Sequence, residues 1–149
     1  MTYEDALTYL GLFANYERWP VPEAMRTMKL ERMQRLCSRL GDPQRSFRCV
    51  VVAGTNGKGS IASLLYSMLR ESTMRVGLYT SPHLDSVRER IRVWTAGPSD
   101  GERTHGEDWI SEEEFASLVE AIWPTVESMN AQSPLGEVTT FELLTAMAF

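Results

Sequence analysis

The spacing of apolar residues predicts helices before residue 41 and after residue 111. A first helix is predicted to begin near Tyr3, where Thr2 and Asp5 are able to cap it. A second helix should end at Gly41 and Pro43, residue types that commonly stop helices. Its apolar positions fall on one face and are Leu30, Met33, Leu36, Cys37 and Leu40. Both helices are therefore predicted to be amphipathic, each with one face toward a core.

Two further helices are predicted in the last third of the chain. Ser111 would cap a long helix, and Glu114 would complete a capping box with it. The core face of this helix comprises Phe115, Leu118, Val119, Ile122, Val126 and Met129. A final helix is predicted from Thr139 or Thr140, and its apolar pattern still continues at Phe149.

Between these helical regions the pattern favours a parallel sheet. The run Cys-Val-Val-Val-Ala at 49–53 predicts a strand buried on both faces, which is typical of parallel sheets. A helix with one buried face should follow, with apolar positions Ile61, Leu64, Leu65, Met68 and Leu69. A second strand at 75–79 would complete a βαβ unit, and alternation at 88–94 predicts a half-exposed strand. The predicted fold class is therefore α/β, with helices flanking a parallel sheet.

The segment between the first predicted strand and its helix is typical of a phosphate-binding loop. It reads Gly54, Thr55, Asn56, Gly57, Lys58, Gly59, Ser60. Glycines let several backbone N–H groups approach a phosphate, and the N-terminus of the following helix adds its dipole. Lys58 supplies a mobile ammonium, while Thr55 or Ser60 offers a hydroxyl to a phosphate or to Mg²⁺. The loop is shorter than the usual GxxxxGK[ST] pattern, and the alternative is a tight turn that binds nothing.

Composition and charge are those of an ordinary globular protein. The 149 residues are 43% hydrophobic and 23% charged, and a chain of this length can bury a core. The formal net charge of −5 argues against a nucleic-acid partner, and no stretch is apolar enough for a membrane helix. Cys37 and Cys49 lack metal-site spacing and are interpreted as reduced packing residues of a cytoplasmic protein.

Charge is distributed unevenly along the chain. Seven basic residues lie between Arg26 and Arg48, whereas no lysine or arginine follows Arg103. We interpret these two stretches as solvated helix faces of opposite sign. The alternative is that the basic stretch faces an anionic substrate.

Four motifs occur in an order that resembles one enzyme family. They are Ala53-Gly-Thr-Asn-Gly-Lys-Gly-Ser60, Tyr79-Thr-Ser-Pro-His-Leu84, Glu89-Arg-Ile-Arg92 and Thr140-Phe-Glu-Leu-Leu-Thr145. Together they resemble the N-terminal part of folylpolyglutamate synthase/dihydrofolate synthase, within the Mur ligase superfamily. The shortened phosphate loop is typical of that superfamily, and the second and third motifs favour its folate branch. The open alternatives are another Mur-type ligase, of peptidoglycan or cyanophycin type, and a non-catalytic nucleotide-binding fragment.

The resemblance implies an ATP-dependent ligase that joins glutamate to dihydropteroate or a folate through an acyl phosphate, using ATP and Mg²⁺. It implies that residues 54–60 hold the phosphates, with Lys58 as the main catalytic cation. Ser81 and Glu142 match the family's Mg²⁺ ligands and should meet near Lys58. The candidate contacts to an anionic substrate are His83, Arg90 and Arg92.

Each candidate outside the loop also has a simpler interpretation. Ser81 precedes a proline and is typical of a turn. Glu142 stands at the capping-box position of the predicted final helix. His83 is equally typical of a packed or solvated loop residue, and Arg90 and Arg92 are typical of a solvent-exposed strand face.

The resemblance also implies parts that these residues do not supply. Members of the family are several times longer and add further strands, another Mg²⁺-binding histidine, a modified lysine and a second domain. The chain is therefore expected to be the N-terminal part of an ATP-binding domain, inactive as a ligase by itself. Its sequence leaves open which folate substrate is used and whether the protein forms oligomers.

Overall fold

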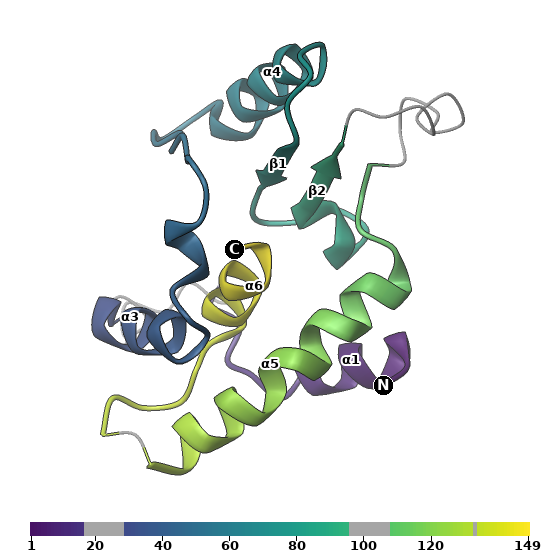
Figure 1. Ribbon diagram of the computed structural model, residues 1–149. Helices are drawn as coiled ribbons and strands as arrows, with labels where there is room; N and C mark the ends of the chain where they lie inside the picture. Colours follow the sequence, from purple (N-terminus) through teal and green to yellow (C-terminus); the bar gives the residue numbers. More distant parts are fainter. Residues whose placement is uncertain (17–28, 96–107, 133) are drawn as a thin grey trace. The chain divides into compact units, whose positions relative to one another are not determined.

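The chain forms two compact units in the computed structural model, which describes residues 1–16, 29–95, 108–132 and 134–149 (Figure 1). The first unit is made from the two ends of the sequence, Met1–Arg48 and Glu112–Phe149. The second unit is the continuous segment Cys49–Ser111. The candidate phosphate loop therefore belongs to the second unit, and Glu142 belongs to the first.

The first unit is helical. Its elements are α1 (Tyr3–Leu10), α3 (Leu30–Arg39), a short 3₁₀ helix (Pro43–Arg45), α5 (Glu112–Gln132) and α6 (Thr140–Ala148). The four helices predicted from apolar spacing in this part of the sequence are confirmed. Helix α1 packs against α5, and α3 contacts both α5 and α6 (Figure 1).

The apolar face of α5 forms the core of this unit. Phe115 and Val126 are completely buried, and the ring of Phe115 meets that of Tyr3 edge to face at a centroid distance of 5.6 Å. Helix α6 adds Leu143 and Leu144, which are also completely buried. Burial of an apolar side chain of this size contributes about 1.5–3 kcal/mol. This face of α5 therefore holds α1 and α6 in one unit.

Capping boxes begin two of these helices. At α1, the Thr2 hydroxyl accepts the Asp5 N–H at 3.1 Å, and the Asp5 carboxylate accepts the Thr2 N–H at 3.0 Å. Thr139 and Glu142 form the same arrangement at α6. Each box satisfies N–H groups that have no partner inside the helix. The predicted caps at both helices are confirmed.

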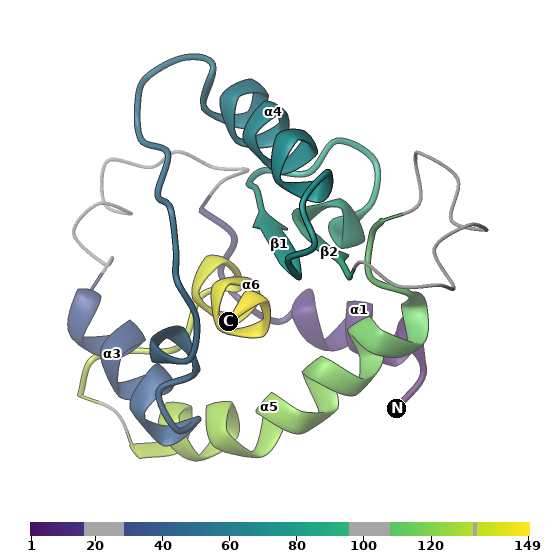
Figure 2. The same cartoon turned by 45° about the horizontal axis from the view of Figure 1, so that its top comes forward.

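The second unit combines one helix with a small sheet. Its elements are α4 (Lys58–Arg70), β1 (Val76–Tyr79), a 3₁₀ helix (Val87–Arg90) and β2 (Ile91–Trp94). β1 and β2 pair antiparallel, with Val76 opposite Trp94 and Tyr79 opposite Ile91. Helix α4 packs against β1 (Figure 2). The helix after the glycine-rich loop and the two strands near 75–79 and 88–94 are thus confirmed.

The predicted strand at residues 49–53 does not form. Val50 and Val51 are 71% and 83% exposed, and β1 makes its ladder with β2 instead. A doubly buried strand needs neighbours on both edges and layers on both faces. The described residues of this unit provide a two-stranded antiparallel sheet only, so the predicted parallel pairing is absent from them. Cys49 is likewise exposed, and its predicted packing role is wrong, although both cysteines are free as expected.

The predicted core face of α4 is exposed within the second unit. Ile61, Leu64 and Met68 stand on that face and are each more than half exposed. The helix instead buries Tyr66, because it contacts β1 with a different side. The second unit therefore carries an apolar helix face without cover from its own described residues.

We predict that the 149-residue chain associates with itself through this face, since exposed apolar patches promote association. Leu64→Lys combined with Met68→Lys should shift the chain toward the monomer, because two charged faces do not pack together. Sedimentation velocity at several protein concentrations measures the shift. Ser63→Lys combined with Ser67→Lys is the control, since it adds the same charges to α4 and keeps the apolar residues. A wild-type chain that stays monomeric at every concentration would contradict the prediction.

Candidate phosphate loop and metal ligands

Residues 54–60 form an exposed segment that leads into the first turn of α4. Gly57 precedes the helix with a φ of +74°, a left-handed conformation that favours glycine. The helix starts at Lys58, and the N–H of Ile61 bonds back to the Gly57 carbonyl at 3.0 Å. The N–H groups of residues 58–60 have no acceptor inside the helix, so they can donate hydrogen bonds to an anion from solvent.

The ammonium of Lys58 lies over this loop. Its Nζ donates to the carbonyl oxygens of Gly54 at 2.6 Å and Thr55 at 3.2 Å. The Lys58 side chain is exposed, so it can exchange these carbonyls for phosphate oxygens without disturbing a packed core. The geometry suits a phosphate group, and phosphate binding itself stays a prediction.

Glu89 shapes the loop that follows Ser81. Its carboxylate accepts the N–H groups of Leu84, Asp85 and Ser86 at 3.0, 2.8 and 2.7 Å. Ser86 and Glu89 also form a capping box that starts the 3₁₀ helix Val87–Arg90. These backbone hydrogen bonds, first of all the one from Leu84, lower the pKa of Glu89 below its usual value. The spacing of serine and glutamate is a capping signal that the sequence already carried.

Arg90 and His83 lie together in the second unit. Arg90 is 1% exposed, so the interpretation as a solvent-exposed strand residue is wrong for it. It stands in the 3₁₀ helix before β2, which removes it from the alternation of that strand. Its Nε donates to His83 Nδ1 at 2.9 Å. Because an arginine Nε only donates, His83 Nδ1 accepts, and the proton of the neutral ring lies on Nε2.

Arg92 lies on β2 with a partly exposed side chain. Its Nη1 is 3.9 Å from Oδ1 of the buried Asp108, which also pairs with Arg70 Nη1 at 3.4 Å. The Arg70 guanidinium in turn lies over the ring of Trp94, 4.1 Å from its centroid. Arg92 therefore helps to compensate a buried carboxylate, and its contact with a substrate stays a prediction.

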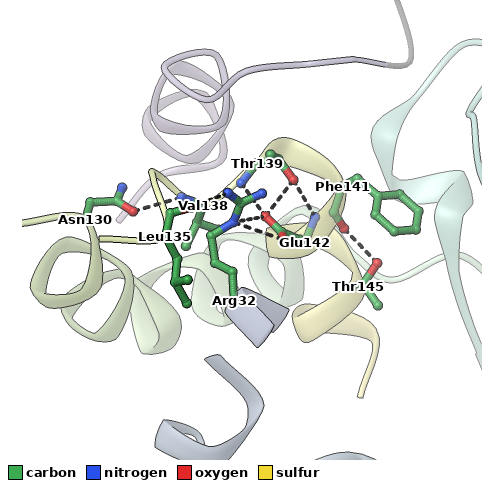
Figure 3. A network of polar contacts seen from close by, with 8 residues as sticks. All are labelled: Arg32, Asn130, Leu135, Val138, Thr139, Phe141, Glu142 and Thr145. Atoms are coloured by element: carbon green, nitrogen blue, oxygen red, sulfur yellow. Dashed lines mark hydrogen bonds and ion pairs between the residues drawn. The ribbon is translucent and has the colours of Figure 1, made fainter. Parts of the chain in front are cut away.

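Glu142 is buried at the start of α6 (Figure 3). Its Oε2 accepts the N–H of Thr139 at 2.9 Å and the Thr139 hydroxyl at 2.8 Å. Arg32 Nε donates to both oxygens, at 3.0 Å to Oε1 and 2.8 Å to Oε2. The capping interpretation of Glu142 is confirmed, and its role as a metal ligand stays a prediction.

Sequence reasoning placed Arg32 on a solvated basic face, and this is wrong. Arg32 is 3% exposed. It stands four residues before the buried Leu36, so the two side chains share one face of α3. This place on the apolar face of α3 was the sequence signal that Arg32 is buried. A charged residue on such a face indicates a buried partner of opposite charge.

Magnesium fits the donor types that the chain offers. Among residues 1–16, 29–95, 108–132 and 134–149, no group of three or more His, Cys, Asp or Glu side chains is close enough to hold a metal ion. A carboxylate, a hydroxyl and phosphate oxygens are nevertheless the hard ligands that Mg²⁺ takes in nucleotide sites. Glu142 supplies a carboxylate, and the exposed Ser81 supplies a hydroxyl. They lie in different units, so joint coordination stays a prediction.

Comparison with known proteins gives one consistent relationship, although no protein-family model matches the chain. The chain is 42% identical over 120 residues to dihydrofolate synthase/folylpolyglutamate synthase of Bacillus subtilis (strain 168). That alignment covers 80% of the chain and 25% of the relative. The resemblance to the folylpolyglutamate/dihydrofolate synthases is confirmed.

Solved structures agree. Folylpolyglutamate synthase from Thermotoga maritima matches with a TM-score of 0.76 and 32% identity, over 98% of this chain and 29% of that one. A folylpolyglutamate synthase complex with AMPPCP and folate matches with a TM-score of 0.74 and 30% identity, over 99% of this chain and 31% of that one. The chain thus shares the α/β fold of these enzymes and spans about a quarter to a third of their length. In the part of the chain that the structure describes, no helix is long and apolar enough to cross a membrane.

We predict a pH-dependent loosening of the loop that Glu89 holds. Because the pKa of Glu89 is lowered on folding, its stabilising effect is present above the unfolded value of about 4.3 and is lost as pH falls through the folded value. The amide NMR signals of Leu84 and Ser86 should therefore move together with a midpoint below pH 4.3. In Glu89→Gln this transition should disappear, whereas the exposed Glu71→Gln should retain it. A midpoint at the ordinary pKa of glutamate would contradict the prediction.

Proposed function

We propose that this chain carries the phosphate-binding part of an ATP-dependent ligase that joins glutamate to dihydropteroate or a folate. The observation that carries the proposal is the exposed loop 54–60, where a left-handed Gly57, a free helix start and the Lys58 ammonium converge. A neighbouring structure holds AMPPCP, an analogue of ATP, together with folate. A relative 42% identical to the chain is a dihydrofolate synthase/folylpolyglutamate synthase.

In this reaction the chain's residues bind and orient charged groups. A carboxylate of the pteroate or folate attacks the γ-phosphorus of ATP, ADP leaves, and the amine of glutamate then displaces phosphate from the acyl phosphate. The loop amides and Lys58 stabilise the phosphate charge. Ser81 and Glu142 would hold Mg²⁺, which adds charge neutralisation when it is bound. His83 and Arg92 are the candidate contacts to an anionic group of the substrate.

We further infer that the chain forms the N-terminal part of a Mur-ligase-like ATP-binding domain with a P-loop-type parallel sheet, acting on small molecules in the cytoplasm. Two features support this larger sheet. Val50 and Val51 of the apolar run 49–53 are exposed, as is the face of α4 with Ile61, Leu64 and Met68. Both are surfaces that a parallel sheet with flanking helices would bury.

Lys58→Ala in the natural full-length protein should lower kcat/KM for ATP by at least about 100-fold, because one preorganised donor to the transferring phosphate is lost. Release of ADP in the presence of Mg²⁺, dihydropteroate or folate, and glutamate measures the effect. Lys29→Ala is the matched control, since Lys29 is exposed and is the only other lysine of the chain. Wild-type turnover in Lys58→Ala would overturn the phosphate-loop assignment. Wild-type protein that accepts no pteroate or folate substrate would overturn the folate assignment.

The 149-residue chain by itself is expected to bind ATP weakly and to form no amide product. These relatives are about three times as long as the chain, and in this proposal the rest of such an enzyme completes the nucleotide and glutamate sites. Isothermal titration with ATP and Mg²⁺, followed by an assay for the amide product, tests both expectations. Sustained product formation by the purified chain would show that these residues suffice.

A further inference from the structure

Arg32 connects three segments of the first unit (Figure 3). It comes from α3 and reaches Glu142, 110 positions later in the sequence, at the start of α6. Its Nη1 also donates to the carbonyl of Leu135 at 3.0 Å, in the loop before α6. One buried guanidinium thus fixes the loop that leads into α6 and the carboxylate that caps it.

The hydrogen bonds to the two oxygens of Glu142 are unequal. Oε2 accepts the N–H and hydroxyl of Thr139 and the Nε–H of Arg32, and these fill its acceptor capacity. Among the described residues, Oε1 accepts the Arg32 Nε–H alone, at 3.0 Å. A carboxylate oxygen has two lone pairs, so Oε1 keeps one for a further partner.

Capping α6 does not require an arginine. Two other capping boxes of the described chain, Thr2–Asp5 and Ser86–Glu89, work through hydroxyl and backbone groups. A buried ion pair is also a weak source of stability, because desolvation of the two charges offsets most of their attraction. The cap itself therefore does not depend on Arg32, whose hydrogen bonds join α3 to the start of α6 and fix the orientation of the Glu142 carboxylate.

We propose that Arg32 is a positioning residue for the metal site of the ligase. It holds the Glu142 carboxylate so that one lone pair of Oε1 stays available to Mg²⁺. This inference rests on the proposed function, in which Glu142 is a metal ligand. A planar guanidinium can hold the carboxylate through Nε and the Leu135 carbonyl through Nη1 in one fixed geometry, whereas a lysine ammonium cannot.

The test compares Mn²⁺ binding, as a substitute for Mg²⁺, in the natural full-length protein with an ATP analogue present. Electron paramagnetic resonance counts free Mn²⁺ and gives the dissociation constant. Arg32→Gln should weaken Mn²⁺ binding by about 10-fold or more, the usual effect of removing a group that orients a metal ligand. Arg32→Lys should weaken Mn²⁺ binding as well, because lysine keeps the positive charge but lacks the planar guanidinium. Arg39→Gln, on the same helix with an exposed hydrogen bond to Ser128, should leave the constant unchanged.

Several outcomes would overturn the inference. An Arg32→Gln protein that melts earlier and binds Mn²⁺ with the wild-type constant would assign Arg32 a structural role only. Full recovery by Arg32→Lys would show that charge alone matters. Tighter binding in Arg32→Gln would show that the guanidinium competes with the metal.

A measurement on the wild-type protein needs no variant to fold. In ¹⁵N-arginine NMR, the protected Nε–H signal of Arg32 should persist when Mg²⁺ and the ATP analogue bind, and its loss would overturn the inference. Wild-type protein that binds the analogue but binds no Mn²⁺ when Mn²⁺ is supplied would overturn the metal assignment of Glu142 and with it the role of Arg32. Wild-type protein that binds metal and nucleotide but forms no folate product would overturn the proposed reaction alone.

Discussion

A buried carboxylate must be compensated on nearly every side, and at Glu142 this requirement organises the first unit. The groups that satisfy it come from α3 and from the residue before α6. Their convergence fixes where α3 lies against the start of α6, while the apolar face of α5 supplies the bulk of the core. One polar cluster thus sets the geometry, and hydrophobic burial stabilises it.

The second unit uses carboxylates in a comparable way. The Glu89 carboxylate accepts hydrogen bonds from N–H groups of the turn after Pro82. The buried Asp108 pairs with Arg70 and Arg92 beside the small sheet. Glu89 thereby stabilises irregular backbone that has no ladder or helix of its own, whereas Asp108 joins side chains of α4 and β2. The candidate phosphate loop differs, because its N–H groups and its lysine remain exposed. The exposed polar groups therefore lie where a charged ligand is expected, and the compensated ones lie where the fold needs them.

The elements that the sequence predicted correctly depend on local signals. Apolar periodicity and capping residues lie within a few positions of each other, as at Thr2 and Asp5 or at Thr139 and Glu142, so they specify helices without reference to the rest of the chain. The run at 49–53 failed because the burial of a strand depends on neighbours that a short window of sequence does not show.

The same reasoning separates the parts of the candidate site. The glycine-rich loop is a local motif, and its position before α4 was predictable from the residues themselves. Arg32 and Arg90 were misplaced because a charged residue is assigned to solvent by default. Their partners, Glu142 and His83, come from other segments, and only the folded arrangement brings each pair together.

The division of the first unit into two stretches of sequence has a consequence for its folding during synthesis. Helices α1 and α3 leave the ribosome before the whole of the second unit, and their packing partners α5 and α6 follow it. At a synthesis rate of about 5–20 residues per second, Glu142 is made on the order of ten seconds after its partner Arg32. The second unit is continuous, so all of its residues are made during that interval. The nascent chain is therefore expected to acquire its phosphate loop before its N-terminal helices are covered, an order of assembly that exposes α1 and α3 to chaperones.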